Sequence, residues 1–327
     1  MAEMTYRNAV AQAITEEMER DPNVILMGED VGRFGGAMAA TKGIYEKFGA
    51  KRVIDTPISE AAIIGAALGA ALTGLRPIAE IMFVDFMTCC MDQIANQVAK
   101  VRYMLGGQVN VPLVIRTQGG AGKSYAAQHS QNLEVWFAAI PGLRVVMPAT
   151  PADAKGLLKT AIRSNDPVMV IENKVLYGEK GEVPDSNEYL VPIGKATVVR
   201  PGKNVTVVSY SRQLFESLKA AEICVSAGID CEVIDLKTIS PLDMNTILKS
   251  LEKTGRLVIV EEGHKSFGVG AEISAEIMEK GFDLLEAPVA RVASLDTPIP
   301  FSPVLEKATI PNSDKIASAI KKLFTAA

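Results

Sequence analysis

The residues best placed for chemistry lie in the sequence Asp55-Thr56-Pro57-Ile58-Ser59-Glu60. Glu60 is the only charged residue in the 18-residue run from Ile58 to Leu75, which is otherwise built from Ala, Gly, Leu, Ile, Ser and Thr. A carboxyl group among apolar neighbours is harder to ionise, so that near neutral pH it can both donate and accept a proton. A solvated glutamate at a helix start is the competing interpretation. We predict an acid–base role for Glu60.

The elements around Glu60 favour that role. Arg52-Val53-Ile54 is typical of a short strand, Thr56-Pro57 ends it, and the Ala/Gly-rich run predicts a helix. Glu60 then lies at the carboxyl end of a strand, the edge where open α/β sheets bind ligands. Glu29-Asp30 follow the apolar strand 24–27 and occupy an equivalent place. A membrane span is rejected for the helix, because Glu60 and Arg76-Pro77 flank it and Ala and Gly supply little hydrophobic drive.

Composition limits the classes of protein that this chain can represent. The chain has 327 residues, 48% of them hydrophobic, which is enough for a large core and two domains. The 34 basic and 38 acidic residues give a net charge of -4, with no basic block that would indicate nucleic-acid binding. None of the four cysteines forms a CxxC pair, which argues against iron–sulfur ligation, a redox dithiol or a structural zinc site and predicts reduced core thiols. The N-terminus lacks a secretion-signal pattern, so we expect a cytoplasmic protein.

Strand and helix patterns alternate along the chain without hairpin signals, which predicts βαβ units and a mostly parallel, doubly wound sheet. Strands are expected at 24–27, 52–54, 77–83, 111–116, 143–147 and 168–172, and helices at 4–20, 58–75, 86–104, 133–139 and 152–163. Residues 177–203, rich in Gly, Pro, Glu, Asp and Asn, are typical of a boundary. A second alternation follows, with strands at 205–209, 231–234, 257–260 and 289–292 and helices at 214–227, 244–251 and 269–279. We therefore predict a domain over residues 1–190, a linker over 191–203 and a smaller α/β domain over 204–327.

Two glycine clusters invite a phosphate-loop interpretation that their spacing does not support. Gly119-Gly120-Ala121-Gly122-Lys123-Ser124 ends like a Walker A motif, but the position five before Gly122 is Thr117. Gly268-Val269-Gly270 lacks the third glycine of a dinucleotide fingerprint. Both clusters are interpreted as turns. The chain also lacks a Gly-Asp-Gly sequence with a downstream Asn pair, the pattern that would hold magnesium and a diphosphate.

Histidine occurs at two positions only. His129 lies between a glycine-rich stretch and a predicted helix, a loop position that favours chemistry over a structural role. His264 follows Glu261-Glu262-Gly263 in the second domain, where capping or lining a surface loop is an adequate explanation.

Taken together, these blocks resemble the beta subunit of the thiamin-diphosphate-dependent E1 components of 2-oxo acid and acetoin dehydrogenase complexes. The likeness extends from about Thr5 to the C-terminus. It rests on Gly28-Glu29-Asp30-Val31-Gly32, the Asp55–Glu60 sequence, Gly74-Leu75-Arg76-Pro77-Ile78, Asp92-Gln93-Ile94, Arg102-Tyr103-Met104, Gln128-His129-Ser130-Gln131, Pro192–Ala196, Ser240–Asp243 and Phe267–Ile273.

The resemblance implies a role for each site residue. The glutamate that corresponds to Glu60 hydrogen-bonds N1′ of the aminopyrimidine and promotes the imino tautomer, which takes the proton from thiazolium C2. Phe86 matches an aromatic residue that packs on the pyrimidine, and Ile58 an apolar contact beside it. His129 matches a substrate-side histidine suited to steady an oxyanion or relay a proton. Glu29 matches a buried acidic residue near the cofactor.

The resemblance also implies the fold and the partners. The first domain would be a pyrimidine-binding domain and the second a transketolase C-terminal-like domain. An alpha subunit would supply the Mg²⁺ and diphosphate site, so that thiamin diphosphate is shared in an α2β2 heterotetramer that also docks a lipoyl acyltransferase, E2. Some members hold K⁺ through carbonyls at positions matching Leu113, Ala161, Ile162, Ser164 and Asp166, although the last two side chains depart from those usual there.

The expected activity is cleavage of the bond next to a carbonyl and transfer of the acyl group to a lipoyl arm of E2. The regions 76–83, 117–128 and 297–303 look closer to acetoin dehydrogenase beta subunits than to pyruvate or branched-chain ones. Acetoin and pyruvate stay open as substrates. The alternatives are a branched-chain 2-oxo acid E1 beta subunit, the C-terminal half of a split transketolase, and a non-catalytic assembly subunit, which retention of Glu60, Phe86 and His129 together argues against.

Overall fold

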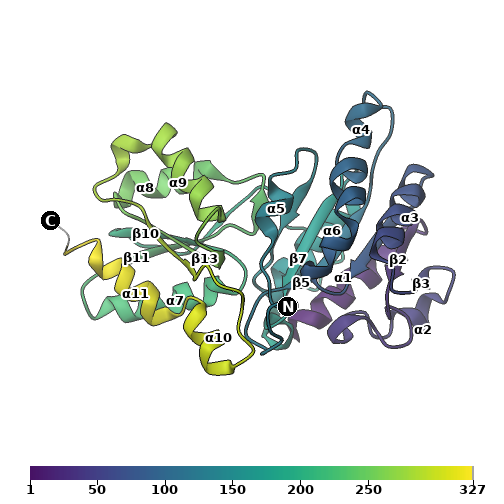
Figure 1. Ribbon diagram of the computed structural model, residues 1–327, viewed down its shortest axis with the longest axis horizontal. Helices are drawn as coiled ribbons and strands as arrows, with labels where there is room; N and C mark the ends of the chain where they lie inside the picture. Colours follow the sequence, from purple (N-terminus) through teal and green to yellow (C-terminus); the bar gives the residue numbers. More distant parts are fainter. Residues whose placement is uncertain (326–327) are drawn as a thin grey trace. The chain divides into compact units, whose positions relative to one another are not determined.

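A computed structural model describes residues 1–325, which form two compact units (Figure 1). The first unit comprises Met1–Gly119 and Trp136–Ile193. The second unit comprises Gly120–Val135 and the chain from Gly194 onward. The segment 120–135, which carries His129, therefore belongs with the C-terminal part of the chain.

The core of the first unit is a parallel sheet. Its strands follow the order β6-β7-β5-β4-β2-β3, and every neighbouring pair runs parallel, which confirms the predicted doubly wound α/β fold. The central strands are nearly continuous apolar runs because helices cover both faces of such a sheet. The strands are β2 (Val24–Gly28), β3 (Val53–Asp55), β4 (Arg76–Ile81), β5 (Val114–Gly119), β6 (Arg144–Val146) and β7 (Val168–Asn173).

The predicted helices of this unit are observed except over 84–104, and the short helix over 44–48 was not predicted. The continuous helix predicted over 86–104 is divided into a 3₁₀ helix, a π-helix and a short α-helix. Thr88 Oγ1 donates to the Asp85 carbonyl at 2.9 Å and so competes for a backbone acceptor early in the run. The elements are α1 (Tyr6–Arg20), η1 (Ala37–Ala39), α2 (Ile44–Phe48), α3 (Glu60–Leu72), η2 (Val84–Cys90), η3 (Gln93–Val98), α4 (Val101–Met104), α5 (Glu134–Ala138, where the chain returns to this unit), α6 (Pro151–Arg163) and η4 (Leu176–Gly178).

Two short strands were missed by the sequence pattern. The first helix does not begin at Met4, because β1 (Ala2–Thr5) pairs antiparallel with β8 (Lys180–Val183), inside the segment expected to be irregular. Thr5 ends β1 and caps α1, its Oγ1 accepting from the amide of Asn8 at 3.4 Å. The polar composition of β8 gives no sign of a strand, and its strand conformation depends on pairing with β1.

The second unit has its own sheet, in the order β14-β13-β10-β11-β9, with only β9 antiparallel. Figure 1 shows α8 and α9 on one face of this sheet and α7 and α11 on the other. Residues 197–200, expected within the linker, form β9. The elements are β9 (Thr197–Arg200), β10 (Val205–Ser209), α7 (Gln213–Val225), β11 (Cys231–Asp235), β12 (Thr238–Ser240), α8 (Met244–Thr254), β13 (Leu257–His264), α9 (Val269–Lys280), η5 (Phe282–Leu284), β14 (Ala290–Ser294), α10 (Pro303–Thr309) and α11 (Ser313–Lys322).

None of the helices among residues 1–325 combines the length and the apolar character that a membrane span requires. The Ala/Gly-rich α3, for which that interpretation was rejected, is 13 residues long.

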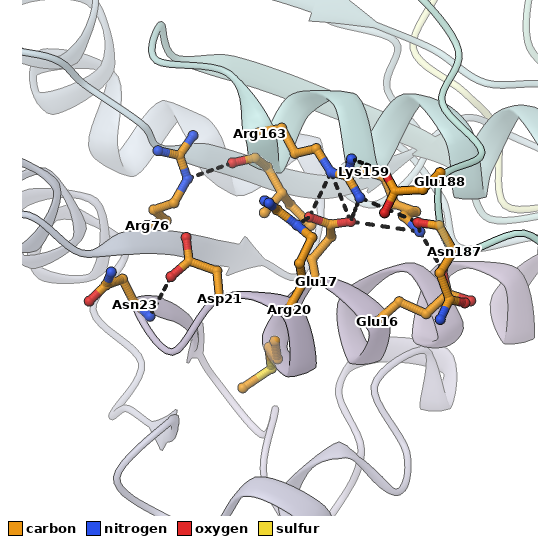
Figure 2. Close-up of polar contacts among 12 residues, drawn as sticks. Glu16, Glu17, Arg20, Asp21, Asn23, Arg76, Lys159, Arg163, Asn187 and Glu188 are labelled. Atoms are coloured by element: carbon orange, nitrogen blue, oxygen red, sulfur yellow. Dashed lines mark hydrogen bonds and ion pairs between the residues drawn. The ribbon is translucent and has the colours of Figure 1, made fainter.

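A buried ionic network joins α1 to α6 in the first unit (Figure 2). Glu17, Lys155 and Lys159 are each fully buried. Lys155 pairs with Glu16 at 2.8 Å, and Lys159 pairs with Glu16 and, at 3.6 Å, with Glu17. Arg163 adds a bond to Glu17 at 2.8 Å. Charges of both signs are therefore removed from water together, which is tolerated only while each keeps its partner.

We expect Lys159→Met to lower the free energy of unfolding by about 3–5 kcal/mol, because two carboxylates would stay buried with one cation fewer. Urea unfolding followed by circular dichroism measures this. The matched control is Lys47→Met, which breaks a half-exposed pair with Glu19 and should cost less than about 1 kcal/mol. Equal losses in the two variants would show that burial does not govern the network.

Candidate active site

Three of the predicted site residues follow the carboxyl ends of neighbouring strands in the first unit. Glu29 comes directly after β2, Glu60 is the first residue of α3 after β3, and Phe86 lies in η2 after β4. Since β3, β2 and β4 are adjacent and parallel, their carboxyl ends share one edge of the sheet. The structure therefore places Glu60 after the carboxyl end of a strand, as predicted from the sequence.

Backbone contacts fix the chain at this edge. The carboxylate of Asp55 accepts from the amide of Gly32 at 2.6 Å, and the amide of Thr56 donates to the carbonyl of Gly28 at 3.0 Å. A Cβ on Gly32 would lie 2.3 Å from Asp55 Oδ2, and one on Gly28 would lie 2.6 Å from the carbonyl of Glu80. A side chain at position 28 would clash with the backbone of β4, whereas one at position 32 would displace the carboxylate of Asp55 that its amide binds.

The carboxylates at this edge influence one another. Burial, followed by the nearby charges of Asp30 and Glu60, raises the pKa of Glu29. Burial, followed by the charges of Glu60 and Cys89, raises the pKa of the Cys90 thiol to about 12. Glu29 and Cys90 are therefore both within electrostatic reach of Glu60. Like charges beside a partly buried carboxylate favour retention of its proton, and among these carboxylates the raised pKa is that of Glu29.

The two predicted apolar contacts differ in their surroundings. Phe86 is half-buried and stands edge-on to Phe83, with ring centroids 5.7 Å apart and planes at 82°. The ammonium of Lys174 lies 6.0 Å from the Phe83 ring. Ile58, in contrast, is 75% exposed. The aromatic wall is thus formed within this chain, whereas the apolar side chain of Ile58 faces outward.

Below this edge lies a buried network that the sequence analysis did not identify. The guanidinium of Arg116, fully buried on β5, contacts Glu80 of β4 and forms two bonds to Glu172 of β7, at 2.6 and 2.8 Å. The hydroxyl of Tyr177 donates to Glu172 at 2.5 Å. Glu80 in turn accepts from the amide of Ala37 at 3.0 Å, which ties the loop after Glu29 to the sheet.

In this network the effects of burial on the pKa values of Arg116 and Glu80 are each opposed by the charge of the partner. Burial by itself would lower the pKa of Arg116, but the carboxylates of Glu172 and Glu80 outweigh it and raise that pKa. Burial raises the pKa of Glu80, and the charge of Arg116 and the amide of Ala37 oppose the rise. A single charge within each of two apolar strand sequences, Ile78–Ile81 and Val114–Thr117, was the signal that could have revealed the pair.

His129 belongs to the second unit, whereas Glu60, Glu29 and Phe86 belong to the first. His129 is half-buried in the segment 120–135 of the second unit, where the sequence predicted a loop before a helix. His264 ends β13 of the same unit, and its Nδ1 lies 2.8 Å from the carbonyl of Leu295. A carbonyl only accepts, so Nδ1 carries the proton.

Comparison with known proteins gives the family. The model of the transketolase pyrimidine binding domain matches residues 2–180, and that of the transketolase C-terminal domain matches residues 194–316. The acetoin:2,6-dichlorophenolindophenol oxidoreductase subunit beta of Cupriavidus necator is 49% identical over 98% of this chain and 97% of its own length. The pyruvate dehydrogenase E1 component subunit beta of Rhizobium meliloti is 48% identical, over 98% of this chain and 70% of its own.

This chain belongs to the E1 beta subunit family. The human mitochondrial pyruvate dehydrogenase E1 beta subunit is also 48% identical, over 98% of this chain and 90% of its own. Among solved structures, an inactive beta4 tetramer of a split gene transketolase superposes with a TM-score of 0.80 at 22% identity, covering 98% of each chain. That likeness concerns the fold alone. The resemblance stated from the sequence is confirmed.

Four of the five carbonyls predicted for K⁺ in this E1 beta subunit accept hydrogen bonds. Arg76 donates to the carbonyls of Ile162 at 2.9 Å and Ser164 at 2.5 Å. The Leu113 carbonyl accepts from Val168 at 3.0 Å and the Ala161 carbonyl from Ser164 at 3.1 Å. Each carbonyl keeps a second lone pair. A cation there would nevertheless share two of its ligands with a guanidinium. The side chain of Asp166 is paired with Arg102 and Arg144.

Side-chain metal ligands do not cluster in the described part of the chain. Within residues 1–325, no three His, Cys, Asp or Glu side chains are grouped as a metal ion would require. All four cysteines are free thiols, with Cys89 exposed and the other three buried. The expectation of core thiols is therefore wrong for Cys89.

The second unit contains a buried acidic pair. Glu134 and Glu261 are each 1% exposed, and a Cβ on Gly263 would lie 3.3 Å from Glu134 Oε1 and 4.0 Å from Glu261 Oε2. Glu134 Oε1 accepts from the Tyr210 hydroxyl at 2.8 Å, and Glu261 Oε1 accepts from the Gly270 amide at 3.2 Å. Burial, opposed by the Gly270 amide and assisted by the charge of Glu134, raises the pKa of Glu261 to about 8.

This shift predicts a pH-dependent stability. The folded chain keeps a proton on Glu261 that the unfolded chain releases above its ordinary pKa, so the stabilisation is present at low pH and is lost as pH rises through about 8. We expect the free energy of unfolding to fall by about 1.4 kcal/mol per pH unit between about pH 5 and 8 from this group. Glu261→Gln should remove that slope because the amide stays neutral. Urea unfolding at several pH values measures it.

The control is Glu252→Gln on the exposed face of α8, which should leave the pH dependence unchanged. A Glu261→Gln slope equal to that of the unaltered chain would mean that Glu261 is ionised in the folded state.

Proposed function

We propose that this chain is the beta subunit of a thiamin-diphosphate-dependent acetoin or pyruvate dehydrogenase E1 component. The observation that carries the proposal is the place of Glu60, at the first residue of α3 on the ligand-binding edge of the sheet, within electrostatic reach of Glu29. Relatives at 48–49% identity over 98% of the chain are named as acetoin and pyruvate dehydrogenase beta subunits. In this reading the chain cleaves the bond next to a carbonyl and passes the acyl group to a lipoyl arm of E2.

The residues at the edge fit the pyrimidine half of thiamin diphosphate. Bound there, the cofactor would supply an acidic carbon that attacks a carbonyl. Glu60 would exchange a proton with the ring nitrogen N1′, for which a carboxyl group held at a fixed position is needed. Phe86 offers an aromatic face, and the outward-facing Ile58 an apolar contact. Glu29, with its raised pKa, would keep the site from accumulating negative charge.

His129 is proposed to act on the substrate. An imidazole can donate a hydrogen bond to a developing oxyanion or move a proton to it near neutral pH. The same assignment follows from the family's motif, matched here by Gln128-His129-Ser130-Gln131.

The proposed partners are those that the resemblance to E1 beta subunits implies. We propose that an alpha subunit holds Mg²⁺ and the diphosphate in an α2β2 heterotetramer, and that a lipoyl acyltransferase docks on the second domain. The lack of a Gly-Asp-Gly sequence with a downstream Asn pair in this chain agrees with that division of the site. A cytoplasmic location and the K⁺ site remain predictions. For K⁺, the ligand set would have to accommodate the guanidinium of Arg76.

We expect Glu60→Gln to slow hydrogen–deuterium exchange at C2 of the cofactor by about 100- to 10,000-fold in the heterotetramer, because the amide keeps the volume and cannot exchange a proton with N1′. Rapid-quench exchange followed by proton NMR measures it. The matched control is Glu46→Gln, another glutamate in the first turn of a helix of the same unit, which is exposed. Unchanged exchange in Glu60→Gln would remove Glu60 from the mechanism.

The substrate is expected to be small. Reduction of a dye by the heterotetramer should be faster with acetoin or pyruvate than with 3-methyl-2-oxobutanoate, by at least about 10- to 200-fold, because the branched acid has two more carbons than pyruvate and each changes transition-state binding by about 1–3 kcal/mol. The comparison uses kcat/KM for the three compounds. A preference for the branched acid would overturn the substrate proposal and leave the role of Glu60 intact.

A further inference from the structure

The segment that carries His129 is a closed loop. The amide of Gly120 donates to the carbonyl of Gln131 at 3.0 Å, so the ends of residues 120–131 meet. Asn132, just beyond, donates from its side chain to the carbonyl of Glu262 at 3.5 Å. A compact loop with joined ends is typical of functional Ω-loops, whose shape depends on contacts made by the middle of the loop.

Two buried carboxylates hold the first part of this loop by its backbone. Glu262, 5% exposed at the end of β13, accepts from the amide of Ala121 at 2.6 Å. Glu306, 3% exposed on α10, accepts from the amides of Gly122 at 2.7 Å and Ser124 at 3.1 Å. Hydrogen bonds from amides to ionised carboxylates are among the stronger ones in proteins.

Further contacts hold the first part of the loop. Arg212 donates to the carbonyl of Ala121 at 3.2 Å and lies 3.6 Å from the carboxylate of Glu262. The side chain of Ala121 is buried with Ile299 and Ile310. The amide, carbonyl and methyl groups of one residue are therefore all fixed.

The loop backbone needs such support. Gly122 has a φ of 103°, and the non-glycine residues Ser124 and Ala126 have φ values of 57° and 61°. Left-handed conformations are unfavourable for residues with a Cβ and persist where the surroundings over-determine them. Glu306 binds the amides of two of these residues, Gly122 and Ser124, and Ser124 lies five residues before His129. The glycine-rich sequence that ends like a phosphate loop therefore does not bind a phosphate with these amides. Its amides bind carboxylates of the same chain.

We propose that Glu306, together with Glu262, is a positioning residue that sets the place of His129 through the backbone of residues 121–124. The inference rests on the proposed role of His129 in the substrate step. Glu306 touches neither substrate nor cofactor in this account. Glu306 therefore affects the rate of the substrate step, which uses His129. It does not affect activation of the cofactor, which uses Glu60 in the other unit.

The test uses the reconstituted heterotetramer with Glu306→Gln. The amide would present one NH₂ donor to a backbone donor, so one anchor becomes repulsive while the volume is kept. We expect kcat/KM for acetoin or pyruvate, whichever is the better substrate, to fall by about 10- to 100-fold, the effect of small misplacement at an active site. C2 exchange should stay within about twofold of the unaltered enzyme. Glu252→Gln is the matched control.

A double-mutant cycle separates positioning from a merely structural role. If Glu306 acts through His129, then Glu306→Gln should have no further effect on kcat/KM in a His129→Ala background. A structural role would give additive losses and would also slow C2 exchange. Gly122→Ala perturbs the loop at a φ of 103° without altering either carboxylate, and it should reproduce the pattern if Glu306→Gln fails to assemble.

The outcomes are distinct. Unaltered kcat/KM in Glu306→Gln, additive losses in the cycle, or, should that variant not assemble, unaltered kcat/KM in Gly122→Ala would each overturn the inference. If the unaltered heterotetramer neither exchanges C2 nor oxidises acetoin or pyruvate, the proposed function itself fails.

Discussion

The ligand-binding edge of the first sheet depends on the ion pairs that the guanidinium of Arg116 makes with Glu80 and Glu172. The guanidinium lies between carboxylates from the two strands that flank β5, so it cross-links β4, β5 and β7 below the site. Glu80 extends the link to Ala37 and thereby to the loop that follows Glu29. Removing the cation would leave two buried carboxylates without their partner, and removing the carboxylates would leave a buried cation without its own.

The two units neutralise buried carboxylates in different ways. In the first unit, Glu80 and Glu172 face Arg116, and Glu17 faces Lys159 and Arg163. In the second unit, backbone amides bind Glu262 and Glu306, while Glu261, with its raised pKa, favours the neutral form. Ion pairs leave the geometry insensitive to pH near neutrality. The carboxylates of Glu262 and Glu306 fix the conformation of the loop over residues 120–131, because oxygens of both carboxylates bind backbone amides of that loop.

The sequence was sufficient for features encoded locally and insufficient for features that depend on pairing. The strand before Asp55, the break at Pro57 and the apolar run after Glu60 are local signals, so the edge and its glutamate were predicted. The link from Arg116 to Glu80 and Glu172 depends on the strand order, and Glu306 lies 184 residues from Gly122. β8 is a polar segment whose only strand signal is its partner β1.

The discontinuous second unit has a consequence for the order in which the chain becomes structured during translation. Residues 120–135 leave the ribosome well before Glu306, their anchor 184 residues later. At about 5–20 residues per second, that interval is roughly 10 to 40 seconds. The His129 loop must spend this time without its anchor while the first unit, which begins before the loop and resumes after it, can already fold. The loop therefore reaches its final conformation late, after most of the chain has been synthesised.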